Sequence, residues 1–156
     1  MTLEFPLPDY SLRRGSILDK ALLVKFIQRT YQEIFPSRDF SHLSRTVENY
    51  LSNDTPLWWV YKNQQPSPIA CLWAGNAIDQ VTGSRHTHIF LLYVEPTHRR
   101  QGIAKTLMQH VENWAKQKGD PQIGLQVFTT NTPALELYKQ LGYQTQSLWM
   151  IKSLEG

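Results

Sequence analysis

Apolar residues recur along the first third of the chain at the spacing of an α-helix. The first such segment runs from Leu18 to Phe35, and Pro36 ends it. A second, shorter helix is predicted over roughly 41–51, because its apolar residues fall on one side. Two consecutive helices therefore follow the irregular, proline-bearing lead-in over 1–8.

Elsewhere β-branched and aromatic residues gather in short runs, which is typical of strands. Such runs lie at 10–15, 57–61, 69–77, 86–94, 123–128 and 143–152. The polar stretch 62–68 predicts a hairpin turn between the second and third runs. Trp58, Trp59 and Trp73 fall within the runs, so we expect them in the core of a sheet.

Two further helices interrupt the strands in the second half of the chain. The clearer one carries a stripe of apolar side chains and is closed by Gly119. This stripe consists of Ile103, Leu107, Val111, Trp114 and Ala115. The shorter one opens with Pro133 in a first-turn position, with Thr132 as its cap and Gly142 as its terminator.

The predicted order of elements is β-α-α-β-β-β-α-β-α-β, with one strand–helix–strand crossover. This mixture predicts an α/β fold of the α+β layered kind. A chain of 156 residues has the size of one domain that buries a full core without disulfides or metal. Since no repeat or linker divides it, we expect a single domain over 1–156.

Composition narrows the class of protein. With 41% hydrophobic and 19% charged residues, the chain falls among ordinary soluble globular proteins. Sixteen Lys and Arg against 13 Asp and Glu give a net charge of +3, and their scattered positions do not indicate a specific nucleic-acid surface. Cys71 is the only cysteine, which excludes an internal disulfide, and its apolar neighbours indicate a buried, inert thiol.

Two stretches of the chain bear on its location and assembly. Residues 1–9 carry prolines and acids rather than a signal peptide, and no apolar run approaches about 18 residues. We therefore expect a cytoplasmic protein with no membrane partner. The apolar run 143–152 is compatible with a monomer and with a homodimer.

The stretch 94–107, V-E-P-T-H-R-R-Q-G-I-A-K-T-L, joins a strand to a helix through a basic loop. The first N–H groups of a helix lack partners within it, and the peptide dipoles place partial positive charge there, so an anion is stabilised at that end. Gly102 and Ala104 are small, which lets the backbone approach phosphate oxygens. Arg99 and Arg100 add charge-assisted hydrogen bonds.

Two motifs carry a resemblance to a known family. The spacing Arg99-x-x-Gly102-x-Ala104, after V-x-P at the end of an apolar strand, resembles the acyl-CoA pyrophosphate loop of the GNAT (N-acetyltransferase) superfamily. Downstream, Asn131-x-x-Ala134-x-x-x-Tyr138-x-x-x-Gly142-Tyr143 resembles the second motif of the same superfamily. The resemblance covers residues 86–143. It implies a central mixed, mostly antiparallel sheet with helices on both faces, acetyl-CoA as cosubstrate and no metal.

The resemblance also implies which residues contact acetyl-CoA. These are Leu92 and Val94 on the strand, Arg99, Arg100, Gln101, Gly102, Ile103, Ala104 and Lys105 at the loop and helix start, and Asn131, Ala134 and Tyr138 in the second motif. In the superfamily, backbone groups matching Leu92 and Val94 hold the pantetheine arm where the strand separates from its neighbour, and a backbone amide there meets the oxyanion. Asn131 bonds the same arm.

Acetyl transfer to an amine requires an acid for the departing thiolate and a route for removing a proton from the ammonium. By resemblance, Tyr138 stands beside the sulfur, and a phenol with a pKa of about 10 can protonate a CoA thiolate. Asn131, Leu135 and Tyr138 follow at i, i+4 and i+7, so they share a helix face. We expect Tyr138 to be the general acid; the alternative is a half-buried core residue.

Two residues are candidates for the general base. Many superfamily members place a glutamate on the strand that ends in V-x-P, and this chain has His88 at the matching position. A neutral imidazole with a pKa of about 6.5 is a competent base. Because alternate strand residues share a face, His86, His88, Phe90 and Leu92 are expected on one side, toward the cleft. His88 as base or holder of a relaying water, Glu95 as base, and a structural His88 all remain open.

These residues predict a GNAT-type N-acetyltransferase that moves an acetyl group from acetyl-CoA to a primary amine by direct attack. A basic protein amine, a peptide N-terminus and a small metabolite remain open as acceptors, because the loop 35–40 and the terminal strands carry no diagnostic motif. The alternative is a non-catalytic acyl-CoA sensor or interaction module on the same fold. A nucleotide-binding module is disfavoured, because neither a Gly-x-Gly-x-x-Gly nor a Gly-Lys-Ser/Thr sequence occurs.

Overall fold

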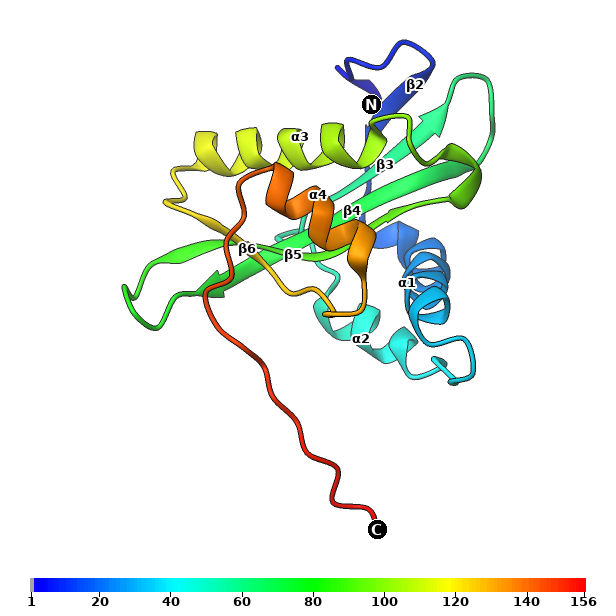
Figure 1. Ribbon diagram of the computed structural model, residues 1–156. Helices are drawn as coiled ribbons and strands as arrows, with labels where there is room; N and C mark the ends of the chain where they lie inside the picture. The colour runs from blue at the N-terminus through cyan, green and yellow to red at the C-terminus, as the bar shows by residue number, and fades with distance from the viewer. Residues whose placement is uncertain (1) are drawn as a thin grey trace. The chain divides into compact units, whose positions relative to one another are not determined.

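The computed structural model describes residues 2–156 (Figure 1) and contains two compact units, one extending to Gln126 and one comprising Val127–Gly156. The first contains β1 (Thr2–Leu3), β2 (Tyr10–Arg14), α1 (Lys20–Ile34), α2 (Leu43–Tyr50), β3 (Leu57–Lys62), β4 (Pro68–Ile78), β5 (Arg85–Val94), α3 (Ile103–Lys118) and β6 (Ile123–Leu125), with short 3-10 helices at Ile17–Asp19 and Pro96–His98. The second contains α4 (Thr132–Gln140) and an extended C-terminal segment.

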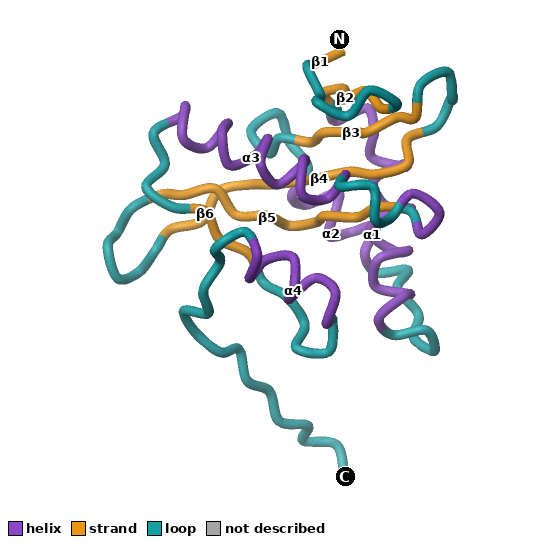
Figure 2. The backbone as a smooth tube through the Cα atoms, turned by 45° about the horizontal axis from the view of Figure 1, so that its top comes forward, coloured by secondary structure: helices purple, strands orange, loops and turns teal. Residues whose placement is uncertain are grey.

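The strands of the first unit form one six-stranded sheet in the order β1-β2-β3-β4-β5-β6 (Figure 2). Neighbouring strands from β1 to β5 are antiparallel, as short connections allow. β6 joins β5 in parallel, because α3 carries the chain back across the sheet before β6 begins. The mixed, mostly antiparallel sheet is therefore confirmed.

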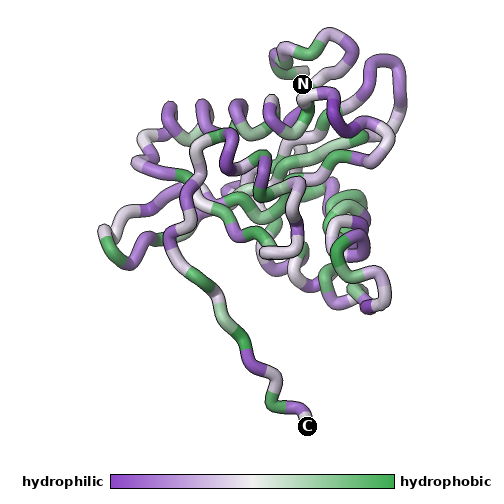
Figure 3. Tube along the Cα trace, in the orientation of Figure 1, coloured by the Kyte–Doolittle hydropathy of each residue, from purple (hydrophilic) through white to green (hydrophobic). Residues whose placement is uncertain are grey.

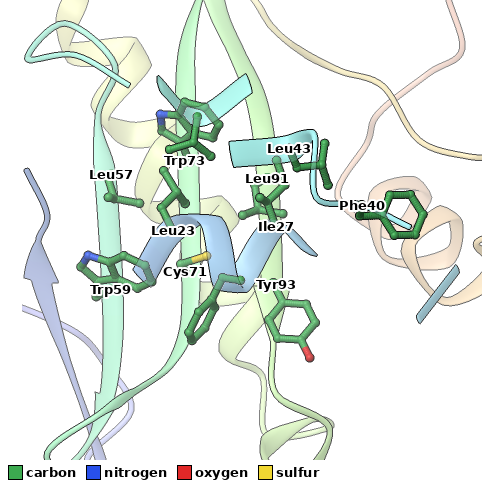
Figure 4. Close-up of a cluster of buried hydrophobic side chains, with 12 residues drawn as sticks. Leu23, Ile27, Phe40, Leu43, Leu57, Trp59, Cys71, Trp73, Leu91 and Tyr93 are labelled. Carbon is green, nitrogen blue, oxygen red and sulfur yellow. The ribbon is translucent and has the colours of Figure 1, made fainter. Parts of the chain in front are cut away.

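Helices cover both faces of this sheet, as expected. On one face α1 and α2 pack on a cluster of buried side chains (Figure 4), in which Phe26 meets Trp59 edge-on at 5.2 Å between ring centroids. On the other face α3 packs through Trp114, whose ring lies 5.6 Å from that of Trp58. Neighbouring tryptophans on β3 thus point to opposite faces, which is the alternation of a strand. Both are buried, and so is Trp73.

The start of α1 is tied to the sheet by one carboxylate. Asp19 accepts from the backbone N–H of Ser16 at 2.9 Å, and Ser16 caps the preceding 3-10 turn in return, which forms a capping box. The same carboxylate accepts from the indole N–H of Trp59 at 3.1 Å. The helix therefore begins at a fixed point above β3, and it ends at Ile34, ahead of Pro36, as the sequence predicts.

The strand predicted over 143–152 is wrong. These residues form no ladder in the described part of the chain, and Leu148, Trp149 and Met150 are 75%, 79% and 83% exposed. Figure 3 shows the apolar positions of this C-terminal segment in green. A β-rich composition produces a strand only where a neighbouring strand supplies hydrogen bonds and a packed face.

Smaller boundary predictions also differ from the structure. β6 ends at Leu125 rather than at residue 128, because its parallel pairing with β5 ends there. The cap of α4 is Asn131 rather than Thr132, since the Asn131 side chain accepts from the backbone N–H of Ala134. In the lead-in, residues 2–3 add a short strand against β2.

Candidate functional site

β5 is irregular where the predicted site begins. Trp73 of β4 pairs with Leu91, but the next residue, Ala74, pairs with Ile89, so Phe90 is an extra residue opposite β4. Such a bulge shifts the alternation of side chains by one position and leaves the extra residue outside the ladder. The pattern of apolar residues in the sequence contains no sign of it.

The bulge decides which side chains share the face that α1 and α2 cover. The Phe90 ring meets Trp73 at 4.9 Å, Tyr50 of α2 at 6.1 Å and His88 at 5.9 Å between centroids. His86 follows on the same side, 6.5 Å from His88. This part of the strand therefore lines one aromatic surface.

Leu92 does not share that surface, so the prediction of one common side for all four residues is wrong. Leu91 and Tyr93 belong to the buried cluster under α1 and α2. Leu92 lies between them in sequence and pairs directly with Leu72, so it projects toward α3. Because of the extra residue at the bulge, the side chains of Leu92 and His88 point to opposite faces of the sheet.

β5 is paired along only part of its second edge. β6 pairs with β5 only from Thr87 to Ile89, so in the first unit the rest of β5 has an open edge. The backbone N–H of Glu95 donates to the Ile69 carbonyl at 2.8 Å. By the alternation of an antiparallel ladder, Leu92 and Val94 then turn their backbone groups away from β4, toward the open edge.

The loop after β5 ends in a glycine that begins α3. Gly102 is the N-cap, with φ +81°, a conformation that side chains rarely adopt. A Cβ built there meets no heavy atom within 4 Å, so open space lies in front of the first turn. Arg100 also has a positive φ of 64°, and backbone strain of this kind clusters at functional sites.

The first turn of α3 is suited to an anion. Its first hydrogen bonds run back to the Gly102 carbonyl from the backbone and the side chain of Thr106. The N–H groups of Ile103, Ala104 and Lys105 precede that bond and point out of the helix end. Ile103 is buried and holds the turn in place, whereas Arg100, Gln101 and Lys105 are exposed beside it.

Arg99 differs from the other cations of the loop because its guanidinium is already bound. Its Nε donates to the Val94 carbonyl at 2.8 Å, and one terminal nitrogen contacts both carboxylate oxygens of Glu33, at 2.9 and 2.7 Å. The same guanidinium lies over the Tyr93 ring, 5.5 Å from its centroid.

His88 lies in an environment that keeps it neutral. Burial, and second the neighbouring His86, lower the pKa of His88 from its usual value. His86 itself is 8% exposed, and its Nδ1 has no hydrogen-bond partner among the described residues. The backbone of β6 lies close to both rings, since a Cβ at Gly124 would fall 3.2 Å from His86 Nε2 and 3.5 Å from His88 Nδ1.

The other candidates at the end of β5 have structural partners. Glu95, the alternative base, forms an ion pair with Arg29 of α1 at 2.9 Å. His98, at the edge of the loop, shares a hydrogen bond of 3.0 Å with the hydroxyl of Tyr10. Of the two candidate bases, His88 therefore has a neutral imidazole, whereas the carboxylate of Glu95 is bound by a cation.

In the second unit the resembling motif forms the expected short helix. The Oδ1 of Asn131 caps α4 by accepting from the Ala134 N–H at 3.4 Å, which leaves the Nδ2 of that amide as a donor. Tyr138 lies two turns on, half-buried, and burial raises its pKa to about 12. Its ring meets that of Tyr143 edge-on at 5.8 Å. A positive φ at Gly142 ends the helix.

Three features of the site were not found from the sequence. Glu33 is 66 positions away from Arg99, and no local pattern connects them. The bulge at Phe90 likewise has no sequence signature. The close approach of Gly124 to the two histidine rings did have a sequence signature, because a glycine within a strand often marks a place where the backbone lies close to another group.

Two kinds of feature are missing from residues 2–156. No helix in this range has both the length and the apolar character that crossing a bilayer requires. No three His, Cys, Asp or Glu side chains in it are grouped so that they could hold a metal ion. Cys71, the one thiol, is buried, and that burial raises its pKa.

The chain belongs to the acetyltransferase (GNAT) family, whose model matches residues 24–143. Human N-acetyltransferase 8 is 28% identical over 102 residues, which are 65% of this chain and 44% of that protein. The ribosomal protein bS18-alanine N-acetyltransferase of Escherichia coli (strain K12) is 31% identical over 75 residues, which are 48% of this chain and 50% of that protein. The chain thus spans about half the length of these relatives.

Solved structures show the same fold over nearly the whole chain. A predicted acetyltransferase from Clostridium acetobutylicum, solved with acetyl-CoA, superposes with a TM-score of 0.75 at 25% identity, covering 93% of this chain and 96% of that one. A putative acetyl transferase from Pyrococcus furiosus gives a TM-score of 0.77 at 22% identity, covering 93% and 99%.

Proposed function

We propose that this protein is an N-acetyltransferase that moves an acetyl group from acetyl-CoA to a primary amine by direct attack. One observation carries the proposal: β5 has an open edge from Phe90 to Val94, and the loop that follows it ends in the left-handed glycine at the start of α3. An extended ligand that ends in phosphates fits an unpaired strand edge leading to a helix N-terminus. The family of the chain supports the same cosubstrate.

Acetyl-CoA is held mainly by backbone groups in this proposal. Leu92 and Val94 bond the amides of the pantetheine arm along the open edge, and an N–H of that edge meets the oxyanion. The pyrophosphate lies at the first turn of α3, where the backbone N–H groups of 101–105 and the side chains of Arg100 and Lys105 face it. Asn131 donates its Nδ2 to the pantetheine arm, and Ala134 in the same turn leaves room for it.

Tyr138 supplies the proton for the departing thiolate. With its pKa raised to about 12, the phenol carries its proton throughout the neutral range. An ordinary thiol has a pKa of about 8.5, but the burial that raises the pKa of the phenol also raises that of a thiol beside it, so the difference narrows. The proton therefore moves as the C–S bond breaks and charge develops on the sulfur.

His88 removes the proton from the ammonium, directly or through one water. It is neutral because its pKa is lowered, and it stands on the aromatic surface of β5 that α1 and α2 cover. The acceptor amine approaches from that surface, with Phe90 and Tyr50 beside it. No covalent enzyme intermediate is needed, because the amine attacks the thioester itself.

The proposal is tested by calorimetric titration of the protein with acetyl-CoA, followed by a free-thiol release assay across small amines, peptide N-termini and basic proteins. Binding together with thiol release supports the transferase. Binding without release from the whole panel favours the sensor, and absence of binding overturns the proposal.

The panel also addresses the acceptor, which we leave at the level of a primary amine. Relatives and neighbours are named for different acceptors: one for a ribosomal protein alanine, one for streptothricin, and one structure for aminoglycosides. We propose that the protein acts in the cytoplasm as a monomer or homodimer. Cell fractionation and light scattering after size exclusion test these two statements.

A further inference from the structure

One charged cluster at the site has no place in the reaction described above. Glu33, in the last turn of α1, accepts from the Tyr93 hydroxyl at 2.8 Å and from Arg99 through both carboxylate oxygens. Arg99 in turn donates a hydrogen bond through its Nε to the Val94 carbonyl. We call this set of contacts, formed by Glu33, Tyr93, Arg99 and the Val94 carbonyl, the Glu33 latch.

The latch joins two parts of the site that are far apart in sequence. α1 leads directly into the loop 35–40, where we expect the acceptor to be chosen, whereas Arg99 begins the loop that faces the phosphates. One turn earlier on α1, Arg29 pairs with Glu95 at 2.9 Å. Two ion pairs of opposite polarity therefore hold the same helix against the end of β5.

The geometry of Arg99 argues against a direct phosphate contact. Its Nε and one terminal nitrogen are used by a carbonyl and a carboxylate, and its charge is compensated by Glu33. The Val94 carbonyl is consequently occupied, so the open edge presents the Val94 N–H to a ligand. Arg100 and Lys105 form no ion pair within residues 2–126, and their charges remain for phosphates.

We propose that Arg99 is a positioning residue rather than a ligand of the phosphates. Through the Glu33 latch it holds in place the loop between β5 and α3, where acetyl-CoA binds. Glu33 is then a positioning residue that acts through Arg99. This inference rests on the proposed function, since it concerns the binding of acetyl-CoA at that loop.

Removal of the Glu33 charge gives opposite results under the two roles of Arg99. If Arg99 holds the loop, Glu33→Gln loosens the loop and weakens acetyl-CoA binding by about two- to fivefold, the loss expected for an exposed ion pair. If Arg99 binds phosphate, the same change frees its guanidinium and removes a carboxylate near the anion, so binding becomes tighter.

Arg99→Lys separates the roles a second time. A lysine keeps the positive charge and still meets a phosphate, but it cannot contact the Val94 carbonyl and both oxygens of Glu33 together. The latch predicts that Arg99→Lys weakens binding as much as Arg99→Gln does. It also predicts that Glu33→Gln combined with Arg99→Gln is no worse than either change alone.

The measurement is calorimetric titration of wild-type and variant proteins with acetyl-CoA at two salt concentrations. Loss of a phosphate contact flattens the salt dependence of Kd, whereas loss of the latch weakens binding without changing that dependence. Glu48→Gln, which breaks the surface pair between Glu48 and Lys20, is the matched control and leaves binding unchanged. Circular dichroism checks that each variant is folded.

The outcomes are distinguishable from failure of the proposed function. Tighter binding by Glu33→Gln, near wild-type binding by Arg99→Lys, or a flattened salt dependence in Arg99→Gln overturns the latch while acetyl-CoA binding by the wild type stands. A wild-type protein that does not bind acetyl-CoA overturns both.

Discussion

At the scale of single residues, two side chains carry the proposed proton transfers. Burial lowers the pKa of His88 and raises that of Tyr138, so the uncharged form of each is favoured. The sequence pointed to both, because Tyr138 lies in a recognisable motif and His88 occupies the position of a glutamate. The directions of their pKa shifts were not readable from the sequence. They depend on how far each side chain is buried and, for His88, on the ring of His86.

Tyr138→Phe should lower kcat by about 10²- to 10⁴-fold, the range for loss of a general acid, while the Kd for acetyl-CoA changes little. The ring is kept, so packing against Tyr143 is preserved. Because the pKa is raised to about 12, the wild-type rate should not fall through loss of this proton below pH 10. Thiol release kinetics and calorimetry measure the two effects, and an unchanged kcat would remove Tyr138 from the mechanism.

His88→Gln should abolish the rise of kcat/KM with pH that a neutral base produces. Since the pKa of His88 is lowered, that rise lies below pH 6.5 in the wild type, and the rate is flat around pH 7. His110→Gln is the matched control, because burial also lowers the pKa of His110, a residue of α3 whose ring packs against Trp58 on the opposite face. A wild-type pH profile in His88→Gln would exclude His88 as the base.

At the scale of elements, local signals predicted the helices well and the strand ends poorly. α1 and α3 appear where apolar spacing and their terminators place them. The bulge at Phe90 and the early end of β6 were not predicted, and the strand that was predicted over 143–152 does not form. A helix satisfies its hydrogen bonds within itself, whereas a strand depends on a partner that is distant in sequence.

The start of α3 is tested by Gly102→Glu. A carboxylate there stands at the proposed phosphate site, and like charges a few ångströms apart cost about 1 kcal/mol or more, so acetyl-CoA binding should weaken at least about fivefold. Both this change and its control strain a left-handed residue, at a cost of about 1–2 kcal/mol in stability. Calorimetry with acetyl-CoA and thermal unfolding measure the two effects.

The control is Gly119→Glu, at the other end of the same helix, where φ is +90° and open space also surrounds the Cβ position. It should lose similar stability and keep its affinity for acetyl-CoA. Gly102→Ala separates strain from charge and should bind better than Gly102→Glu. Equal affinities for all three variants and the wild type would contradict a phosphate site at this helix end.

At the scale of the whole molecule, the two half-buried imidazoles of His88 and His110 couple stability to pH. The folded pKa values of His88 and His110 lie below the unfolded value of about 6.5, so the unfolded chain binds more protons as the pH falls. Their contribution to stability is complete above pH 6.5 and decreases below it, by at most about 1.4 kcal/mol per pH unit for each proton.

Urea unfolding at pH 7.5 and pH 5.5 should therefore show lower stability at the acid end. The two histidine-to-glutamine variants, at His88 and His110, should each reduce the difference between the two pH values. A difference that both variants leave unchanged would place the acid sensitivity elsewhere in the molecule.

The sequence by itself determined the kinds of element, most of their order and the two motifs, because helix periodicity, turn residues and motif spacing are local properties of the chain. The tertiary structure decided the rest: the face of the sheet toward which His88 points, the open edge of β5 and the Glu33 latch. Each depends on residues that folding brings together, such as Glu33 and Arg99, which are 66 positions apart. A local pattern in the sequence cannot show which of such distant groups will interact.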